Sequence, residues 1–331
     1  MRDMLLEIKD LRVAVRRGKT DLPIVKGVNI SVPSGSIVGL VGESGCGKSM
    51  TVKSVMGLMP PTASATGSIL WHESDGSVKD LLLLKEKELR TLCGSKIGMV
   101  FQEPMTSLNP MMRIGDQVAE VLLIHKLVRS RKEAKDKVIG ILREVGIPEP
   151  GLRYRSYPHE LSGGMRQRVV IAIAMICEPG LLIADEPTTA LDVTIEAQIL
   201  KLIRQMCTSY HMSALIITHN MGVVAEICDY VYVMYMGRIM ERAPKDMLFK
   251  DPLHPYTRGL LSSIPRIGAN PEYLSTIPGN IPEIGKEIVG CEFGLRCSDD
   301  ERRCFFERPV ERDAGGGHYV SCFNYSEPFG F

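Results

Sequence analysis

The sequence lacks any hydrophobic run long enough to cross a membrane. Its longest uninterrupted apolar stretch is residues 169–177, far short of the roughly 20 residues that span a bilayer. The first ten residues also lack an apolar secretory core, because charges such as Arg2, Asp3 and Glu7 interrupt them. We therefore expect a cytosolic chain whose contact with the cytoplasmic face of the cell membrane is peripheral.

A large excess of charge of one sign is also missing. The 40 Lys and Arg residues offset 39 Asp and Glu residues, for a net charge of +1, so nothing electrostatic favours a nucleic-acid partner. Nine cysteines, an odd count in a chain without a secretory signal, argue against a disulfide framework. The length of 331 residues, with 44% hydrophobic residues, suits one large globular domain and an additional segment.

What is present is a phosphate-binding pattern. Residues Gly42–Ser49 read G-x-x-x-x-G-K-S and follow the apolar run Ile37–Val41. The glycines let backbone N–H groups point inward at a polyphosphate, and a helix N-terminus adds its positive dipole end. The pattern predicts that Lys48 reaches the β- and γ-phosphates and that Ser49 ligates Mg²⁺. The predicted nucleotide-binding residues are Gly42, Ser44, Gly45, Cys46, Gly47, Lys48, Ser49 and Met50.

A second chemical element is the apolar run Leu181–Ala184, which is followed by Asp185 and Glu186. In a P-loop protein the aspartate at the end of such a strand holds Mg²⁺. Because side chains alternate along an extended chain, we expect Glu186 to project differently from Asp185. We predict that Glu186 orients and deprotonates the water that attacks the γ-phosphate, which favours hydrolysis over phosphoryl transfer.

The hydrophobic periodicity predicts three kinds of structure. Short apolar stretches within the first 35 residues and at 67–71 are typical of antiparallel strands. Between residues 111 and 160 a helical period, with a capping box at Ser130–Glu133, predicts an inserted helical subdomain over about residues 104–165. After residue 180 strands and helices alternate as in a parallel sheet, with strands at 181–184, 214–218 and 230–236 and helices near 195–208 and 221–227.

The stretch Leu161–Gln167, reading LSGGMRQ, is another glycine-bearing loop that opens a helix. Ser162 would cap that helix, and its exposed N–H groups again suit a phosphate. With these motifs in order, the first 250 residues resemble the ATP-binding subunits of ABC transporters, whose signature sequence this is. The resemblance implies an α/β P-loop ATPase with a RecA-like core, an antiparallel β subdomain and the inserted helical subdomain.

The same resemblance implies roles for further residues. Gln102 would touch Mg²⁺ and the attacking water, and His219 would contact the γ-phosphate. Ser162 and Gly164 would bind the nucleotide held by a partner subunit, and Asp192 belongs to the loop that the family calls the D-loop.

One feature departs from the family. Members usually stack adenine on an aromatic side chain in the first β-hairpin, but residues 11–17 contain none. A guanidinium group can stack on a flat ring, so we expect Arg16 or Arg17 to take that place.

Longer strings resemble the dipeptide/oligopeptide importer subfamily: Phe101–Pro110, Tyr157–Glu160 and Asp251–Arg258. That resemblance implies an ATP-hydrolysing motor that works with a second ATP-binding subunit (a second copy or a paralogue), two membrane permease subunits and an extracytoplasmic solute-binding protein. Nickel importers share much of the pattern, so nickel or another small solute is the alternative cargo. A soluble ATPase of the DNA-repair or translation type is a further alternative, but such proteins carry long coiled coils or duplicated nucleotide domains, whereas this chain has one motif set.

Four cysteines fall in the last 41 residues: Cys291, Cys297, Cys304 and Cys322. In a segment rich in Gly and Pro and poor in apolar residues, they predict a metal centre that replaces a missing core. Structural zinc sites favour closer spacings, whereas iron–sulfur clusters accept wider ones. Peptide-importer ATPases carry a similar cysteine pattern, and the resemblance implies a [4Fe–4S] cluster, with zinc as the alternative. We expect residues 1–250 to form the nucleotide-binding domain and residues 251–331 a metal-stabilised extension whose cluster is structural.

Overall fold

The computed structural model describes residues 3–102, 107–189, 191–263, 277–283 and 288–325. The chain forms two compact units. Unit 1 comprises Met1–Leu5, Pro33–Ile37 and Leu84–Ile217, and unit 2 comprises Leu6–Val32, Val38–Leu83 and Thr218–Phe331.

Unit 1 is built on parallel strands that lie side by side in the order β6, β7, β8. Every residue of these strands is buried, which is why their sequences are continuous apolar runs and not alternating patterns. The strands are β6 (Ile97–Val100), β7 (Leu181–Asp185) and β8 (Ser213–Thr218). The helices are α2 (Glu86–Leu92), α4 (Ile114–Ile124), α5 (Arg131–Glu144), α6 (Pro150–Arg153), α7 (Gly163–Met175), α8 (Val193–Ser209) and the short 3₁₀ turn η1 (Pro158–Glu160).

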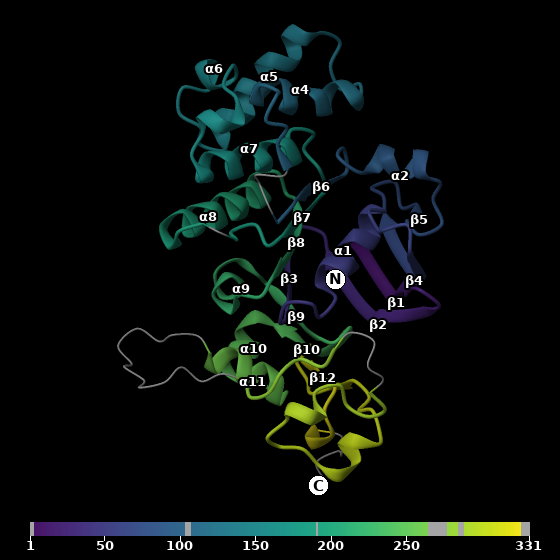
Figure 1. Cartoon of the computed structure of the whole chain (residues 1–331). Coiled ribbons are helices and arrows are strands. Elements are labelled where there is room, and N and C mark those ends of the chain that lie inside the picture. Colours follow the sequence, from purple (N-terminus) through teal and green to yellow (C-terminus); the bar gives the residue numbers. More distant parts are fainter. Residues whose placement is uncertain (1–2, 103–106, 190, 264–276, 284–287, 326–331) are drawn as a thin grey trace. The chain divides into compact units, whose positions relative to one another are not determined.

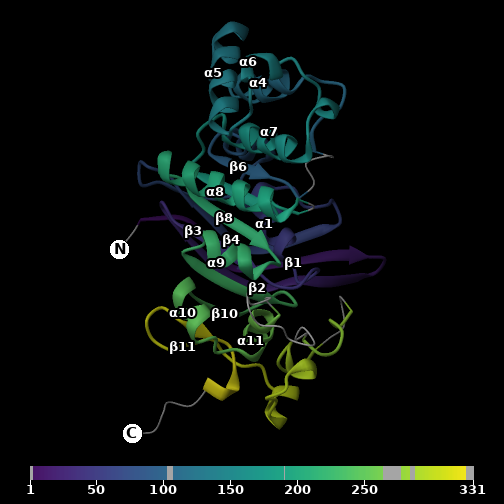
Figure 2. The same ribbon diagram turned by 90° about the vertical axis from the view of Figure 1, so that its left-hand side faces the viewer.

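The helices expected between residues 111 and 160 are present. Helix α5 begins at Arg131 because the Ser130 Oγ accepts a hydrogen bond from the Glu133 N–H at 3.1 Å, as the capping box predicts. Figures 1 and 2 show α4, α5 and α6 gathered at one end of unit 1, with α7 packed against α4, α5 and β6. The helical insertion and the strands thus share one packed unit through α7.

Unit 2 contains two sheets, one in the order β2, β1, β4, β5 and one in which β11, β12, β10, β9 and β3 are neighbours. Strands β3 and β9 pair in parallel, and β9, β10, β12 and β11 pair in antiparallel fashion. The strands are β1 (Met4–Arg17), β2 (Thr20–Pro33), β3 (Ile37–Val41), β4 (Ala63–His72), β5 (Val78–Asp80), β9 (Tyr230–Tyr235), β10 (Arg238–Pro244), β11 (Arg312–Asp313) and β12 (Tyr319–Val320). The helices are α1 (Lys48–Met56), α9 (Met221–Ile227), α10 (Lys245–Lys250) and α11 (Pro255–Ser262), with 3₁₀ turns η2 (Gly294–Arg296), η3 (Arg302–Phe305) and η4 (Phe323–Tyr325).

The short strands expected in the first 35 residues are in fact parts of two long strands. The register of β1 against β4 shifts between Lys9 and Arg12, where Asp10 has a φ of 44°. This irregularity absorbs the charged break in the sequence, so that the strand bends and continues.

We call residues 288–325 the cysteine segment. It consists mainly of 3₁₀ turns and loops, and it joins the sheet where β12 pairs with β10. Its buried apolar side chains are few: Cys291, Phe293 and Val320. The domain boundaries expected at residue 250 and around residues 104–165 stay predictions.

Candidate functional site

The phosphate-binding loop of unit 2 lies between β3 and α1, as its sequence predicts. All five residues of β3 are buried, and α1 begins at Lys48. A Cβ added at Gly42 would collide with the carbonyl oxygen of Met234, and one added at Gly47, whose φ is 111°, would lie 3.1 Å from the Ile24 carbonyl oxygen. These two glycines let the loop pack directly on β9 and β2, which fixes its path.

The side chain of Lys48 is folded into this loop. Its ammonium nitrogen donates to the carbonyl oxygens of Gly42 at 2.7 Å and Glu43 at 3.0 Å, and the residue is only 5% exposed. The neighbouring Cys46 is buried as well, and burial raises the pKa of its thiol. Ser44 and Gly45 are exposed at the outer rim of the loop, whereas Ser49 and Met50 begin the helix and are half-buried.

In unit 1 the carboxylates predicted after β7 are in place, but the direction of Glu186 has another cause than strand alternation. Asp185 is the buried last residue of β7, and Glu186 leaves the strand with a left-handed φ of 48°. Its N–H donates to the Ile217 carbonyl oxygen at 2.8 Å. A non-glycine residue in this conformation is strained, and such residues concentrate at functional sites. Because the backbone of Glu186 is not extended, the expectation that strand alternation sets the direction of its side chain was wrong.

The carboxylate of Glu186 accepts two hydrogen bonds. The Gln102 Nε2 donates to its Oε2 at 3.1 Å, and the Thr189 hydroxyl donates to the same oxygen at 2.9 Å. Two residues predicted to act together, Gln102 and Glu186, are thus brought into contact although 84 positions separate them. Thr189 was not predicted; only its place shortly after the strand could have suggested it.

The signature stretch forms the N-terminus of α7. Ser162 is the N-cap, and its Oγ accepts from the Met165 N–H at 3.4 Å. A Cβ added at Gly164 would lie 2.9 Å from the Ile195 Cγ2 of α8, so this position needs a small residue. Asp192 caps α8 in the same way, since its Oδ1 accepts from the Ile195 N–H at 2.9 Å.

Three consecutive side chains of α7 tie it to its surroundings. The Arg166 Nε donates to the Pro158 carbonyl oxygen at 2.7 Å, and the buried Gln167 Nε2 donates to the Pro187 carbonyl oxygen at 2.6 Å. Arg168 donates to the Val145 carbonyl oxygen and to the Gln198 side chain of α8. The signature helix is therefore anchored to the loop that carries Glu186.

The remaining predicted nucleotide contacts lie in unit 2 and are exposed. His219 follows β8 immediately before α9. Arg16 and Arg17 end β1, and the Arg16 Nε pairs with the Asp21 Oδ1 at 3.1 Å. Residues 103–106, which follow Gln102, and Ala190, which precedes the D-loop residue Asp192 by two positions, lie outside the described residues.

The four predicted cysteines come together. Cys291, Cys297, Cys304 and Cys322 all line one cavity of the cysteine segment, and all four are free thiols. Burial raises the pKa of Cys291 to about 12 and that of Cys297 to about 11, and neighbouring cysteines add to both increases. In the part of the chain that the structure describes, no group of three or more His, Cys, Asp or Glu side chains is arranged to hold a single metal ion.

Each cysteine sulfur also receives a backbone hydrogen bond. The donors are the N–H groups of Phe293 to Cys291, Asp299 to Cys297, Glu301 to Cys304 and Asn324 to Cys322. Such donors stabilise thiolate charge. By contrast His318, a conceivable further ligand, does not line this cavity, since its Nε2 lies 2.6 Å from the Glu241 Oε1 in β10.

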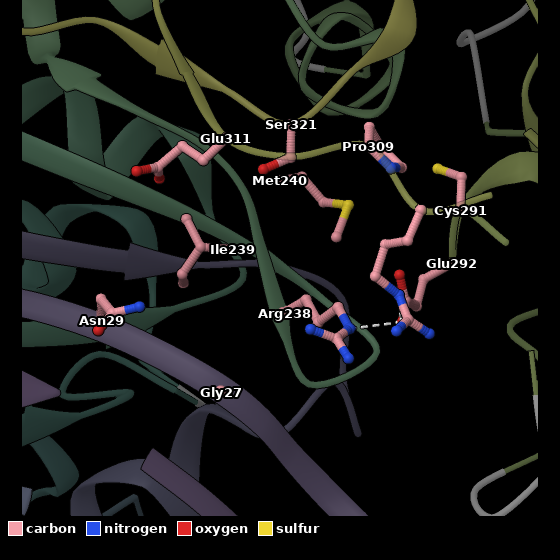
Figure 3. Close-up of a pocket in the computed structure, with 11 residues that line it drawn as sticks. Gly27, Asn29, Arg238, Ile239, Met240, Cys291, Glu292, Pro309, Glu311 and Ser321 are labelled. Atoms are coloured by element: carbon pink, nitrogen blue, oxygen red, sulfur yellow. Dashed lines mark hydrogen bonds and ion pairs between the residues drawn. The ribbon is translucent and has the colours of Figure 1, made fainter. Parts of the chain in front are cut away.

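Buried carboxylates fasten the cysteine segment and the loop before α11 to β10. Glu241 is 1% exposed, and its two oxygens accept from the N–H groups of Leu253 and His254. Figure 3 shows the Arg238 guanidinium of β10 bonded to Glu292 beside Cys291, with Nε to Oε1 at 2.6 Å. Glu241 of β10 thus accepts hydrogen bonds from two backbone N–H groups within the string Asp251–Arg258 that the sequence singled out.

Comparisons with known proteins agree with these motifs. Residues 25–189 match the family model described as "ABC transporter", and residues 240–304 match "Oligopeptide/dipeptide transporter, C-terminal region". The structure is similar to that of the ATP-binding cassette MJ0796 bound to ADP and Pi, with a TM-score of 0.64 and 24% sequence identity. The similarity covers 73% of this chain and 99% of the MJ0796 chain. The structure of cbiO1 from Clostridium perfringens has a TM-score of 0.62 at 27% identity, over 76% and 92%. The mixed α/β fold is thus that of an ABC ATPase cassette.

Full-length relatives are more similar still. The oligopeptide transport ATP-binding protein AppD of Bacillus subtilis is 46% identical over 98% of this chain and 97% of its own length. The dipeptide transport ATP-binding protein DppD of the same organism is 45% identical over 97% and 95%, and the oligopeptide transport protein OppD of Salmonella typhimurium is 44% identical over 97% and 94%. None of the described helices is long and apolar enough to cross a membrane. The chain belongs to the ATP-binding proteins of the oligopeptide/dipeptide group of ABC transporters.

Proposed function

We propose that this protein hydrolyses ATP to drive the import of dipeptides or oligopeptides. The observation that carries the proposal is the identity of 44–46% to peptide-transport ATP-binding proteins over nearly the whole chain, including the C-terminal region particular to that group. The permease subunits would span the membrane, and this chain would bind them at the cytoplasmic face.

The contacts support a division of labour among the predicted residues. Lys48, already held over the loop by carbonyl groups, would neutralise the β- and γ-phosphates. Ser49 and Asp185 would hold Mg²⁺, which supplies charge neutralisation on the transferred phosphoryl group. Glu186 would take the proton of the attacking water, and the Gln102 amide would orient its carboxylate through the hydrogen bond at 3.1 Å.

Two ATP-binding subunits would be needed for one complete site. Ser162 and Gly164 present the N-terminus of α7 outward, which suits a phosphate held by a partner. The partner is either a second copy or a paralogue, and His219 would contact the γ-phosphate from within the same chain as Lys48. Arg16 or Arg17 would stack on adenine at the end of β1, where Arg16 pairs with Asp21 on the surface.

The contact with a permease helix is expected around residues 102–109. Leu108 is only 3% exposed, so it supports the loop and is a poor crosslinking position. Met111, two positions beyond this segment, is 83% exposed. A photoreactive residue at Met111 should crosslink to the permease, whereas crosslinks formed only by the cysteine segment would contradict this surface.

We also propose a [4Fe–4S] cluster at the four cysteines. The shared cavity and the four backbone N–H donors suit thiolate ligands. The wide spacing of the four cysteines in the sequence favours this cluster over zinc, whose structural sites favour closer spacings. When bound, it would supply metal–thiolate bonds that cross-link a segment with little apolar core.

The proposed cargo can be tested by uptake. Cells in which the gene is deleted should lose uptake of labelled di- and tripeptides, and the wild-type gene should restore it, whereas a copy with Glu186→Gln should not. Loss of nickel uptake with peptide uptake intact would favour the nickel alternative. Normal uptake of both would indicate an ATPase with a role outside transport.

A further inference from the structure

Glu43, the second residue of the phosphate-binding loop, is held at all of its polar groups. Its N–H donates to the Tyr256 hydroxyl at 2.9 Å, and its carbonyl oxygen accepts from Lys48 at 3.0 Å. Its carboxylate receives both arms of the Arg296 guanidinium, with Nη1 to Oε2 at 2.8 Å and Nη2 to Oε1 at 3.1 Å. Two of these three attachments come from residues more than 200 positions away in the chain.

Arg296 is itself fixed in a protein environment. It is 8% exposed, and it also donates to the carbonyl oxygens of Pro278 at 3.0 Å and Ile277 at 3.3 Å. Its guanidinium lies 5.8 Å from the centroid of the Tyr235 ring. A bidentate, buried arginine of this kind has one preferred geometry and stays charged.

Arg296 lies in a turn between two of the thiols. It is the last residue of η2, directly before Cys297, and Phe293, the N-cap of the same turn, lies two positions after Cys291. The Phe293 ring packs on Tyr235 and Tyr256 with centroid distances of 5.3 Å each, and its N–H bonds to the Cys291 sulfur. These contacts connect the turn that carries Arg296 to both Cys291 and Cys297.

The charge of Glu43 gives this contact a consequence for ATP. A carboxylate in a loop that receives a polyphosphate repels it, and burial strengthens that repulsion. Arg296 cancels the charge and holds the carboxylate oxygens on its own guanidinium. Buried ion pairs contribute little net stability, so a role in nucleotide affinity is a better account of this pair than a role in stability.

We propose that Arg296 is a positioning residue through which the cysteine segment controls the affinity of the phosphate-binding loop for nucleotide. An ordered segment keeps Glu43 neutralised, and a disordered segment releases a negative charge into the loop. The proposal rests on the proposed binding of ATP, but it does not require that the cysteines hold iron. It can therefore be tested independently of the proposed cluster.

The test compares the affinities of full-length variants for a fluorescent ADP analogue. We expect Arg296→Met to weaken binding at least tenfold. Arg296→Lys keeps the positive charge but cannot donate the two parallel hydrogen bonds of the guanidinium, so it should weaken binding less. The double variant Glu43→Gln with Arg296→Met should recover to within about threefold of wild type, because the uncompensated charge is gone. A pair whose role is only structural predicts instead that the double variant regains thermal stability, while a folded Arg296→Met variant binds the nucleotide with wild-type affinity. Arg302→Met, an exposed arginine in the neighbouring turn η3, is the matched control and should bind normally.

A second pair of variants tests the link to the thiols. Cys297→Ser should weaken nucleotide binding in the wild-type background and have no further effect in the Glu43→Gln background. Iron content is measured in parallel, and the conclusion does not depend on it.

Three results would overturn the proposal: wild-type affinity of a folded Arg296→Met variant, absence of rescue by Glu43→Gln, or an effect of Cys297→Ser that persists without the Glu43 charge. If Arg296→Met does not fold, Arg296→Lys with and without Glu43→Gln decides. The Arg296→Lys variant should bind more weakly than wild type and Glu43→Gln should restore its affinity; absence of either effect refutes the charge argument.

Discussion

The phosphate-binding loop and the cysteine segment both belong to unit 2, but different forces hold them. The loop rests on buried strands, β3 and β9, and on glycines that let the backbone approach its neighbours. The cysteine segment has turns of three or four residues, strands of two residues, and ion pairs such as that of Arg238 with Glu292. A regular hydrophobic support gives a loop whose chemistry can be changed without unfolding it. A segment without such support depends on its polar contacts and thiols for its very structure, so the two regions should respond differently to substitution.

The largest effect is expected at Glu186, the proposed general base. Glu186→Gln keeps the size of the side chain and the contacts with Gln102 and Thr189, so ATP binding should persist. Because loss of a general base typically costs about 10² to 10⁴ in rate, turnover by the assembled transporter should nearly vanish. Steady-state phosphate release and nucleotide affinity, measured on the same preparation, check this. Hydrolysis at half the wild-type rate would refute the role of Glu186.

A smaller effect, on affinity, is expected for Lys48→Ala. The variant loses a charged donor to the phosphates, and hydrogen bonds to charged groups contribute about 1.5–3 kcal/mol, so nucleotide affinity should fall about 10- to 100-fold. The fold should be kept, because β3 remains fully buried. Titration with a fluorescent nucleotide measures the affinity and circular dichroism the fold. Lys53→Ala, in the last turn of the same helix α1, is the control and should bind normally.

Substitution in the cysteine segment should instead loosen the structure. Anaerobically purified protein should be brown with about four irons per chain, and Cys291→Ser or Cys322→Ser should lower the iron content and expose the segment to limited proteolysis. Cys93→Ser, in unit 1, should leave both unchanged. A colourless wild-type protein with one zinc per chain would contradict the cluster. Zinc–thiolate bonds would then cross-link the segment in its place.

The smallest effect is a pH dependence of stability. Burial lowers the pKa of His254 from 6.5 to about 4, and its Nδ1 accepts from the Tyr256 N–H at 3.0 Å. The unfolded chain protonates this histidine below pH 6.5 and the folded chain does not, so its contribution is complete above pH 6.5 and is lost as the pH falls towards 4. Between pH 7 and 5 the loss is about 2 kcal/mol.

The matching variant is His254→Asn, which keeps an N-cap acceptor without titrating. Thermal unfolding between pH 7 and 5 should shift by a few degrees less in this variant than in wild type. The control is His211→Asn, at an exposed position whose φ of 50° asparagine tolerates, and its pH profile should equal that of wild type. Equal profiles for all three proteins would show that His254 does not titrate as its burial implies.

Local patterns were sufficient to predict most of the fold. The loop from Gly42 to Ser49, the cap at Ser130 and the strand ending at Asp185 each depend on residues a few positions apart, and all are present. The sequence also placed four cysteines together without indicating the cavity they share. Assignment of roles to Gln102, His219 and Asp192 came from resemblance and stays a prediction.

What local patterns missed depends on tertiary contacts. The left-handed backbone at Glu186 has no sequence signal, because glutamate does not favour that conformation. The partner of Glu43 lies 253 positions away, and nothing in either neighbourhood indicates the other. The cluster of the extension was expected to be structural, yet within unit 2 Arg296 of the cysteine segment contacts the phosphate-binding loop directly.

The three consecutive anchors of α7 have a mechanical consequence. Because Arg166, Gln167 and Arg168 leave the helix in different directions and each bonds a different element, α7 cannot rotate about its own axis without breaking at least one of these bonds. A displacement of Ser162 at the start of the helix would therefore move α7 as a rigid element. The buried hydrogen bond from Gln167 at 2.6 Å would pass this displacement to Pro187, the residue next to Glu186. The hydrogen bond of Gln167 therefore connects the helix that begins at the signature loop to the residue next to Glu186, the proposed general base.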